Sequence, residues 1–212
     1  MAHQPALIEW DPQCTVGSRL PLFAFTQVFR QVFTSNSAFV INLESRGDRL
    51  HEINAVLGSM GVSNEATVKG VPHSCGTLGC SLTHVLAVAE CMDSNARTCA
   101  VFGDDFELVR DPEEAKAGIV RFFRSEPPSW EVLMLSAHTV TPSSPPAEFS
   151  HLDVIDTAST ASGYMIHRSF ATTLLRNFLQ AASHRNESNC SKAEYAHDVL
   201  GRGISRAVNG LL

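Results

Sequence analysis

Two consecutive carboxylates follow one of the most apolar segments of the chain. Asp104 and Asp105 come after the apolar run 98–102 and Gly103, and Glu107 follows two residues later. Adjacent carboxylates raise each other's pKa unless a cation compensates, so a divalent metal with oxygen ligands is a natural occupant. If the chain stays extended after the strand, the side chains of Asp105 and Glu107 point to the same side. If the chain turns there instead, Asp104 turns with the loop. The alternative interpretation is a plain turn, because Gly-Asp-Asp is a favourable turn sequence.

Two arginines follow another apolar run, residues 38–43. Arg46 and Arg49 lie beside the expected start of a helix, for which Ser45 is a candidate cap. Backbone N–H groups and the helix dipole favour an anion at such a place. The alternative is a solvated first turn with Asp48 near its N-terminal end.

A third segment gathers residues that can ligate zinc, namely His73, Cys75, Cys80 and His84. The spacing lacks the two close cysteines and two close histidines that are typical of structural zinc sites. A second interpretation is a glycine-containing loop that leads into a helix. The first turn of that helix would present Ser81, Thr83 and His84 to a ligand, and among these we single out His84.

The composition indicates one mildly acidic domain of ordinary size. The chain has 212 residues, a formal net charge of −6 and 44% hydrophobic residues, enough for a core without disulfide or metal staples. No basic run is present, so nucleic acid is not expected as a main partner. No Gly-x-Ser-x-Gly, P-loop or Gly-x-Gly-x-x-Gly sequence occurs, which argues against a serine-hydrolase elbow and these phosphate-binding loops.

The sequence leaves the cellular compartment open. No apolar stretch approaches the ~18–20 residues of a membrane span and no signal peptide is visible, so we expect a soluble chain, cytoplasmic by sequence. The Golgi or ER lumen is the alternative if an anchor is missing. Among six cysteines, Cys91 and Cys99 are expected to be buried thiols. Asn186-Glu-Ser and Asn189-Cys-Ser are glycosylation acceptor triplets, a pattern that is common by chance.

Strand and helix patterns alternate along the chain and predict an α/β fold with a mainly parallel central sheet flanked by helices. The expected strands are residues 38–43, 66–71, 98–102, 130–135 and 162–166, and the expected helices follow Ser45, cover 82–89, begin at Pro112 and cover 169–179. Ligands of such sheets bind outside the carboxyl ends of the strands, where the arginines and the paired aspartates fall. The proline-rich run 141–146 is expected to be a surface loop.

We divide the chain into an N-terminal extension, residues 1–36, and a single domain, residues 37–212. The extension carries Phe25, Phe29 and Phe33 at a spacing of four. This spacing predicts a short amphipathic helix that packs on the domain.

Five segments, taken in order, resemble motifs of glycosyltransferase family 25, the lipopolysaccharide-type and procollagen galactosyltransferase-like enzymes. They are Phe39-Val-Ile-Asn-Leu43 with Arg46, Asp48 and Arg49; Gly79-Cys-Ser-Leu-Thr-His84; Val101-Phe-Gly-Asp-Asp-Phe106; Trp130-Glu-Val-Leu-Met-Leu; and Ser162-Gly-Tyr-Met-Ile. Their order makes the resemblance fairly specific. It covers the chain from about Phe39 to Leu175.

The resemblance implies a GT-A type, Rossmann-like domain that transfers a hexose from a UDP-sugar, with galactose or glucose as the sugar and a carbohydrate or glycoprotein as the acceptor. It implies a divalent metal, Mn²⁺ or Mg²⁺, held by Asp104 and Asp105. The residues it places around the nucleotide sugar are Asn42, Leu43, Arg46, Asp48, Arg49, His84 and Asp104. Metal and cationic donors would neutralise the departing diphosphate.

An inverting reaction also needs a carboxylate that deprotonates the acceptor hydroxyl. We assign Asp105 and Asp198 to catalysis, with Asp153 and Asp156 as alternatives to Asp198. Gly103 stands where the family has the first Glu of Glu-Asp-Asp. The alternative function is therefore a catalytically inactive glycosyltransferase-like domain that binds a nucleotide sugar or a protein partner.

Overall fold

A computed structural model provides the structure of the chain. The residues it describes are 29, 32–33, 37–63, 65–124, 130–136, 140–143, 153–158, 161–188, 190 and 207–209. In chain order the elements are β1 (Ala38–Asn42), α2 (Gly47–Ser59), β2 (Ala66–Lys69), α3 (Gly76–Asp93), β3 (Thr98–Gly103), α4 (Pro112–Arg124), β4 (Val132–Ser136), β5 (Val140–Ser143), β6 (Asp153–Ala158), β7 (Gly163–His167), α5 (Arg168–Glu187) and β8 (Ala207–Asn209).

The strands form one eight-stranded sheet in the order β2-β1-β3-β7-β4-β8-β6-β5. β1 pairs in parallel with both β2 and β3, whereas β7 lies antiparallel between β3 and β4. β2, β1, β3, β4, β8 and β5 therefore run one way, and β7 and β6 run the other way. This arrangement confirms the predicted fold class, a Rossmann-like α/β domain with a mainly parallel sheet.

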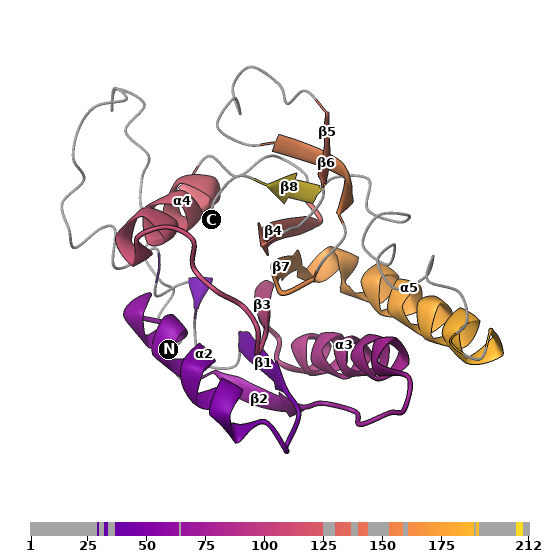
Figure 1. Ribbon diagram of the computed structural model, residues 1–212. Coiled ribbons are helices and arrows are strands. Elements are labelled where there is room, and N and C mark those ends of the chain that lie inside the picture. Colours follow the sequence, from indigo (N-terminus) through magenta and orange to yellow (C-terminus); the bar gives the residue numbers. More distant parts are fainter. Residues whose placement is uncertain are drawn as a thin grey trace, which may run out of the picture.

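Helices cover both faces of the sheet and make three layers (Figure 1). α2 and α4 pack on one face, where Val40 and Phe102 join the same buried cluster as Ile53 and Ile119. α3 and α5 pack on the other face, around Phe39 and other side chains that alternate with the first set. The alternation follows from the two-residue repeat of a strand. A sheet that is buried on both faces explains why its central strands are apolar throughout.

α3 lies directly against the segment that follows β2. A Cβ at Gly79 would be 2.5 Å from the carbonyl oxygen of Val71 and 3.2 Å from the Cβ of His73. The buried Thr83 fastens the same contact, because its Oγ1 donates to the Gly79 carbonyl at 2.8 Å and accepts from the Val71 N–H at 2.8 Å. Glycine is required at position 79 because the colliding atom belongs to the backbone.

The predicted glycine-containing loop before this helix is wrong in extent. α3 begins at Gly76, so Ser81, Thr83 and His84 lie inside the helix and not in its first turn. Glycine is a poor helix former, which is why the sequence pattern favoured a loop. The backbone approach at Gly79 outweighs that propensity.

The prediction of a surface loop at residues 141–146 is also wrong in part. Residues 140–143 form β5, which pairs antiparallel with β6 at the end of the sheet, and residues 144–146 lie outside the described part of the chain. The pairing register shifts between Thr141 and Pro142. Proline is tolerated there because edge strands and bulges leave some N–H groups out of the ladder.

Most of the expected N-terminal extension lies outside the described residues. Of the three phenylalanines predicted to share a helix face, the structure describes Phe29 and Phe33. Both are buried, their ring centroids are 4.7 Å apart, and the Phe33 N–H donates to the Phe29 carbonyl as in a helical turn. These two rings join the core cluster on the α2 and α4 face.

Gly79→Ala is expected to lower the free energy of unfolding by about 1–3 kcal/mol, as overpacking of a core does. Gly58→Ala in α2 is the matched control, because its Cβ would meet nothing within 4 Å. Urea denaturation followed by circular dichroism measures both variants. Equal stability of the two variants would contradict the role given to the Gly79 contact.

Candidate functional site

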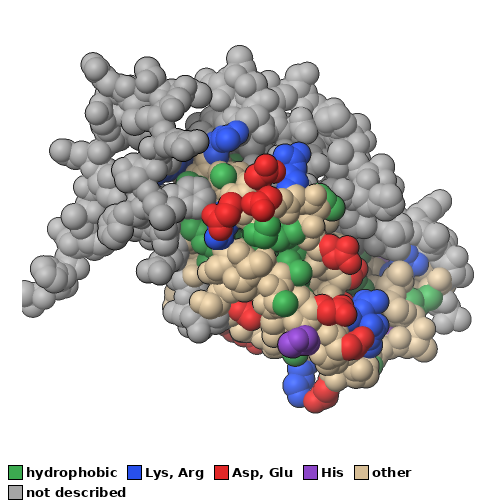
Figure 2. All heavy atoms as spheres, turned by 60° about the vertical axis from the view of Figure 1, so that its left-hand side comes forward, with side chains coloured by type: hydrophobic (Ala, Val, Ile, Leu, Met, Phe, Trp, Pro, Cys, Tyr) green, Lys and Arg blue, Asp and Glu red, His purple; other side chains and the backbone are tan. Residues whose placement is uncertain are grey.

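The site forms where two neighbouring parallel strands end. β1 ends at Asn42 and β3 at Gly103, and Ile41 pairs with Gly103 in the sheet. The polar segments after both strands therefore lie side by side at the carboxyl edge of the sheet. This is the edge at which open α/β sheets bind their ligands. Figure 2 shows acidic and basic side chains interspersed over the neighbouring face that carries α2 and α4.

Arg46 and Asp48 form an exposed ion pair at the start of α2. Nη2 of Arg46 donates to Oδ2 of Asp48 at 2.8 Å, and Nε donates to Oδ1 at 3.0 Å. The hydrogen bonds from Arg46 lower the pKa of Asp48 to about 2. Arg46 is the N-cap residue and makes no side-chain cap bond, so the prediction of Ser45 as cap is wrong. The expectation of arginines beside a helix N-terminus is confirmed.

A second ion pair joins α2 to the turn after β3. Nη1 of Arg49 lies 3.4 Å from Oδ1 of Asp104, although the two residues are 55 positions apart in the sequence. The Asp104 side chain is 16% exposed and that of Arg49 is 40% exposed, so the pair lies at the rim of the site. The structure thus brings together the arginines and one of the two aspartates that the sequence singled out.

The segment Gly103–Phe106 is a turn that presents Asp105 outward. The Phe106 N–H donates to the Gly103 carbonyl at 3.1 Å, and the Phe106 ring is buried. Asp105 and Glu107, on either side of that ring, are exposed. The turn and the ligand set were alternatives in the sequence; the structure shows the turn, with Asp105 exposed on it and Glu107 exposed directly after it, and metal binding stays a prediction.

Gly103 leaves room for the Asp105 carboxylate. A Cβ at position 103 would lie 2.6 Å from Oδ1 of Asp105, and the Gly103 N–H donates to the Ser162 carbonyl at 2.7 Å. A glutamate at this position would displace the Asp105 carboxylate from its present direction. The departure from the Glu-Asp-Asp motif therefore has a local structural consequence.

Asn42 and Leu43 lead from β1 into the site. Asn42 is 4% exposed, and its Nδ2 donates to the Leu43 carbonyl at 2.9 Å. Its Oδ1 is buried and has no hydrogen-bond partner within the described part of the chain. Leu43 is 40% exposed. The Asn42 side chain is thus held against the backbone at the end of β1.

His84 is in the interior. Its Nδ1 shares a hydrogen bond of 2.8 Å with the Tyr164 hydroxyl, and its ring stacks on Phe178 with centroids 4.9 Å apart. Burial lowers the pKa of His84 to about 4, so the ring is neutral near pH 7. Burial also raises the pKa of Tyr164 well above its usual value. The neutral pair ties α3 to β7, and a role of His84 in donor binding stays a prediction.

The zinc interpretation of residues 73–84 is wrong. Cys75 forms a disulfide with Cys190, and His84 is engaged with Tyr164. Within the described ranges no group of three or more His, Cys, Asp or Glu side chains is arranged to hold a metal ion. The ligand types were present in the sequence, but the fold gives Cys75 and His84 other partners.

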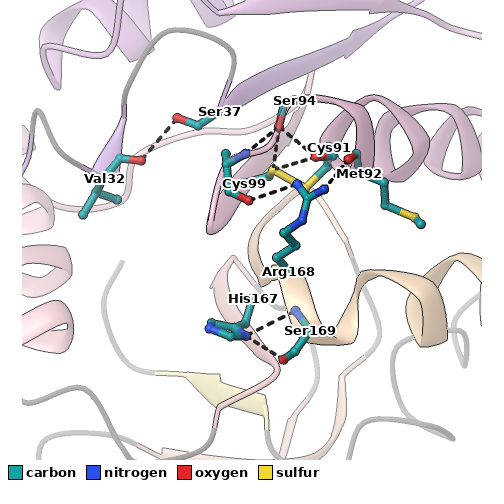
Figure 3. Close-up of a disulfide and its surroundings, with 10 residues drawn as sticks. Val32, Ser37, Cys91, Met92, Ser94, Cys99, His167, Arg168 and Ser169 are labelled. Atoms are coloured by element: carbon teal, nitrogen blue, oxygen red, sulfur yellow. Dashed lines mark hydrogen bonds between the residues drawn. A yellow bond between two sulfur atoms is a disulfide. The ribbon is translucent and has the colours of Figure 1, made fainter. Parts of the chain in front are cut away.

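Cys91 and Cys99 are buried as expected but are not thiols. They form a second disulfide, with Cα atoms 5.9 Å apart, between the end of α3 and the start of β3 (Figure 3). Arg168 contacts the same region, where its Nη2 donates to the Met92 carbonyl at 2.7 Å. The connection between α3 and β3 is thus fixed by covalent and polar contacts.

One further residue, Cys80, lies within electrostatic reach of the carboxylate turn. Partial burial raises the pKa of the Cys80 thiol, and the charges of Asp105 and Asp104 raise it further. Cys80 is the free cysteine of the described part of the chain, and its charge would also raise the pKa of Tyr164. Sequence reasoning placed Cys80 in a zinc set, whereas the structure places its thiol close enough to Asp105 and Asp104 for their charges to raise its pKa.

The expected catalytic base is not placed by the structure. Asp198 lies outside the described residues. Its alternatives, Asp153 and Asp156, belong to β6, which is separated from β3 by three strands in the sheet. The assignment of the base stays a prediction.

Comparisons with known proteins give no family assignment. No protein-family model matches the chain, and no curated protein matches it. Among solved structures it is similar to one described as mannose-1-phosphate geranyltransferase from Thermus thermophilus, with 11% sequence identity and a TM-score of 0.49. The match covers 88% of this chain and 63% of that protein, so this chain corresponds to less than two thirds of its length.

The helices were also compared with the requirements of a membrane span. None of the helices in the described residues combines the length and the apolar character needed to cross a bilayer.

The neutral His84 predicts a specific acid sensitivity. Its pKa is about 4 in the folded chain against an ordinary 6.5, so the unfolded chain takes up a proton first as the pH falls. The stabilising contribution is full above pH 6.5 and is lost toward pH 4, amounting to on the order of 3 kcal/mol. Urea denaturation of the wild type and of His84→Gln across this pH range measures it. Parallel pH profiles of the two proteins would refute the prediction.

Proposed function

We propose that the chain is a transferase that uses a nucleotide sugar, and more specifically a metal-dependent glycosyltransferase. It would move a hexose, galactose or glucose, from a UDP-sugar to a carbohydrate or glycoprotein acceptor. The observation that carries this proposal is the Arg49–Asp104 ion pair. This ion pair joins the basic N-terminus of α2, which follows β1, to the carboxylate turn that follows β3. A nucleoside diphosphate needs the basic groups for its phosphates, and its metal ion needs the carboxylates.

The helix start supplies the donors for a diphosphate. α2 has 13 residues, and its first N–H groups have no partners within the helix. Arg46 and Arg49 flank these groups, and a guanidinium is well suited to phosphate oxygens. Each arginine is also held by a carboxylate, Asp48 or Asp104, so its direction is set before a ligand arrives. Preorganisation of this kind lowers the cost of binding.

The carboxylate turn fits a divalent cation that the substrate completes. Magnesium-like ions are usually held by one or two carboxylates together with substrate phosphates and water, and not by a protein cage. Asp104 and Asp105 are the two carboxylates that would hold Mn²⁺ or Mg²⁺, and the exposed Asp105 is open to such a ligand. When bound, the ion would neutralise the charge that grows on the departing diphosphate.

The residues of the chain would divide the remaining tasks. Arg46 and Arg49 would stabilise the diphosphate as its charge increases, which is where electrostatic catalysis is most effective. Asn42 and Leu43 would position the nucleotide side of the site. A carboxylate must still take the proton of the acceptor hydroxyl, and Asp198 is our candidate, with Asp105 close to the reacting centre.

Calorimetric titration with UDP, with and without Mn²⁺, tests these roles. Arg49→Gln should weaken UDP binding in both conditions, because it removes a phosphate donor. Asp105→Asn should weaken it roughly tenfold, about 1.4 kcal/mol, and only when Mn²⁺ is present. Asp93→Asn, at the far end of α3, is the matched control and should bind like the wild type. Failure of the wild type to bind UDP under either condition would overturn the proposal.

The alternative function is a nucleotide-sugar or protein-binding domain without catalysis. It is favoured by Gly103, which removes one carboxylate of the family motif. A transfer assay that follows release of UDP from UDP-galactose and UDP-glucose separates the two functions. Turnover that disappears in Asp105→Asn supports the enzyme, whereas UDP binding without turnover in the wild type supports the binding domain.

Gly103→Ala should weaken metal binding without unfolding the chain. Its Cβ would fall 2.6 Å from Oδ1 of Asp105 but 3.5 Å from the nearest backbone oxygen, that of Ser162. The carboxylate can rotate away, so we expect roughly a tenfold loss of Mn²⁺-dependent UDP affinity, about 1.4 kcal/mol. The urea midpoint should change little. Unchanged affinity would show that the direction of Asp105 is not important for metal binding.

A further inference from the structure

The last turn of α5 carries an exposed acceptor triplet for N-glycosylation, Asn186-Glu187-Ser188. Asn186 is exposed, and the end of α5 lies at the periphery of the molecule (Figure 1). Asn186 also lines an open hollow of about 240 Å³ beside His73, Ser74 and Cys75. The described residues near this asparagine therefore leave space for a sugar. N-linked glycans require a surface position of this kind.

The disulfides point independently to a compartment where such a glycan is added. Cys75–Cys190 and Cys91–Cys99 engage four of the six cysteines. Disulfides form and persist in secretory compartments and are rare in the reducing cytosol. Cys190 of the first bridge follows Asn186 by four residues, so the triplet and this oxidised cysteine lie on the same short segment.

We propose that the chain folds in an oxidising secretory lumen and that Asn186 is modified there by an N-linked glycan. The modification forms a bond between Nδ2 of Asn186 and the anomeric carbon of a lipid-linked oligosaccharide diphosphate. The bond from that carbon to the phosphate oxygen breaks, the lipid diphosphate leaves, and Nδ2 gives up one proton. Each disulfide forms as two thiols lose two protons and two electrons to a disulfide-bearing oxidoreductase, which is reduced to a dithiol.

The geometry distinguishes Asn186 from the second triplet. The triplet that follows directly, Asn189-Cys190-Ser191, has Cys190 as its middle residue, and this cysteine is bonded to Cys75. In the first triplet Ser188 follows directly on the end of α5, where its Oγ donates to the Arg185 carbonyl at 3.2 Å. A short opening of this last turn presents Asn186 and Ser188 in an extended form, whereas the middle residue of the second triplet, Cys190, is held by its disulfide to Cys75.

The test delivers the full chain to the ER lumen of eukaryotic cells behind a cleavable leader, with leader removal as the check of delivery. Peptide mapping of the wild type should show a glycan on Asn186 that peptide N-glycosidase removes with conversion of the asparagine to aspartate. Asn186→Gln and Ser188→Ala should lose the glycan completely. Ser188→Thr and Asn189→Gln should keep it, because both preserve the first triplet.

The same preparations show whether the cysteines are oxidised. Alkylation under denaturing conditions without reductant should leave Cys75, Cys91, Cys99 and Cys190 unmodified and should label Cys80. A delivered wild type without a glycan, a glycan that persists in Asn186→Gln, or free thiols at both disulfide positions would overturn the inference. These outcomes do not depend on UDP binding, so they are separate from the proposed enzyme activity.

Discussion

The close approach of α3 to the backbone after β2 is the constraint on which the other described features depend. Gly79 removes the side chain that would strike the Val71 carbonyl, and Thr83 joins the two segments with a pair of hydrogen bonds. With α3 fixed in this way, Cys80 lies within electrostatic reach of Asp104 and Asp105, and His84 reaches Tyr164. The contact at Gly79 thus helps to position the buried His84–Tyr164 pair.

In the proposed function an acidic chain binds an anion at one local site. The net charge of −6 describes the whole chain, whereas Arg46 and Arg49 concentrate positive charge at one helix start. Asp48 and Asp104 hold these arginines in place and leave part of each guanidinium for a ligand. Charge distribution at the carboxyl edge of the sheet, and not the total charge, decides which ligands can bind.

The sequence predicted those features that local patterns determine. β1 and α4 were predictable because an apolar strand run and a proline at a helix start have local causes. The antiparallel insertion of β7 was not, because an apolar run reads the same in either direction. The Cys91–Cys99 bridge and the Arg49–Asp104 pair depend on distances between elements, which composition and spacing do not contain. The site could be predicted as residues that follow the ends of two strands, but not that these strands are neighbours or which side chains pair between them.

A crystal structure of the chain with UDP and Mn²⁺, measured at the manganese absorption edge, tests the assignment of the carboxylate turn most directly. The predicted result is an anomalous peak in contact with Asp104 or Asp105, with the UDP phosphates beside Arg46 and Arg49. A manganese peak away from the turn, or UDP bound away from the carboxyl ends of β1 and β3, would contradict it.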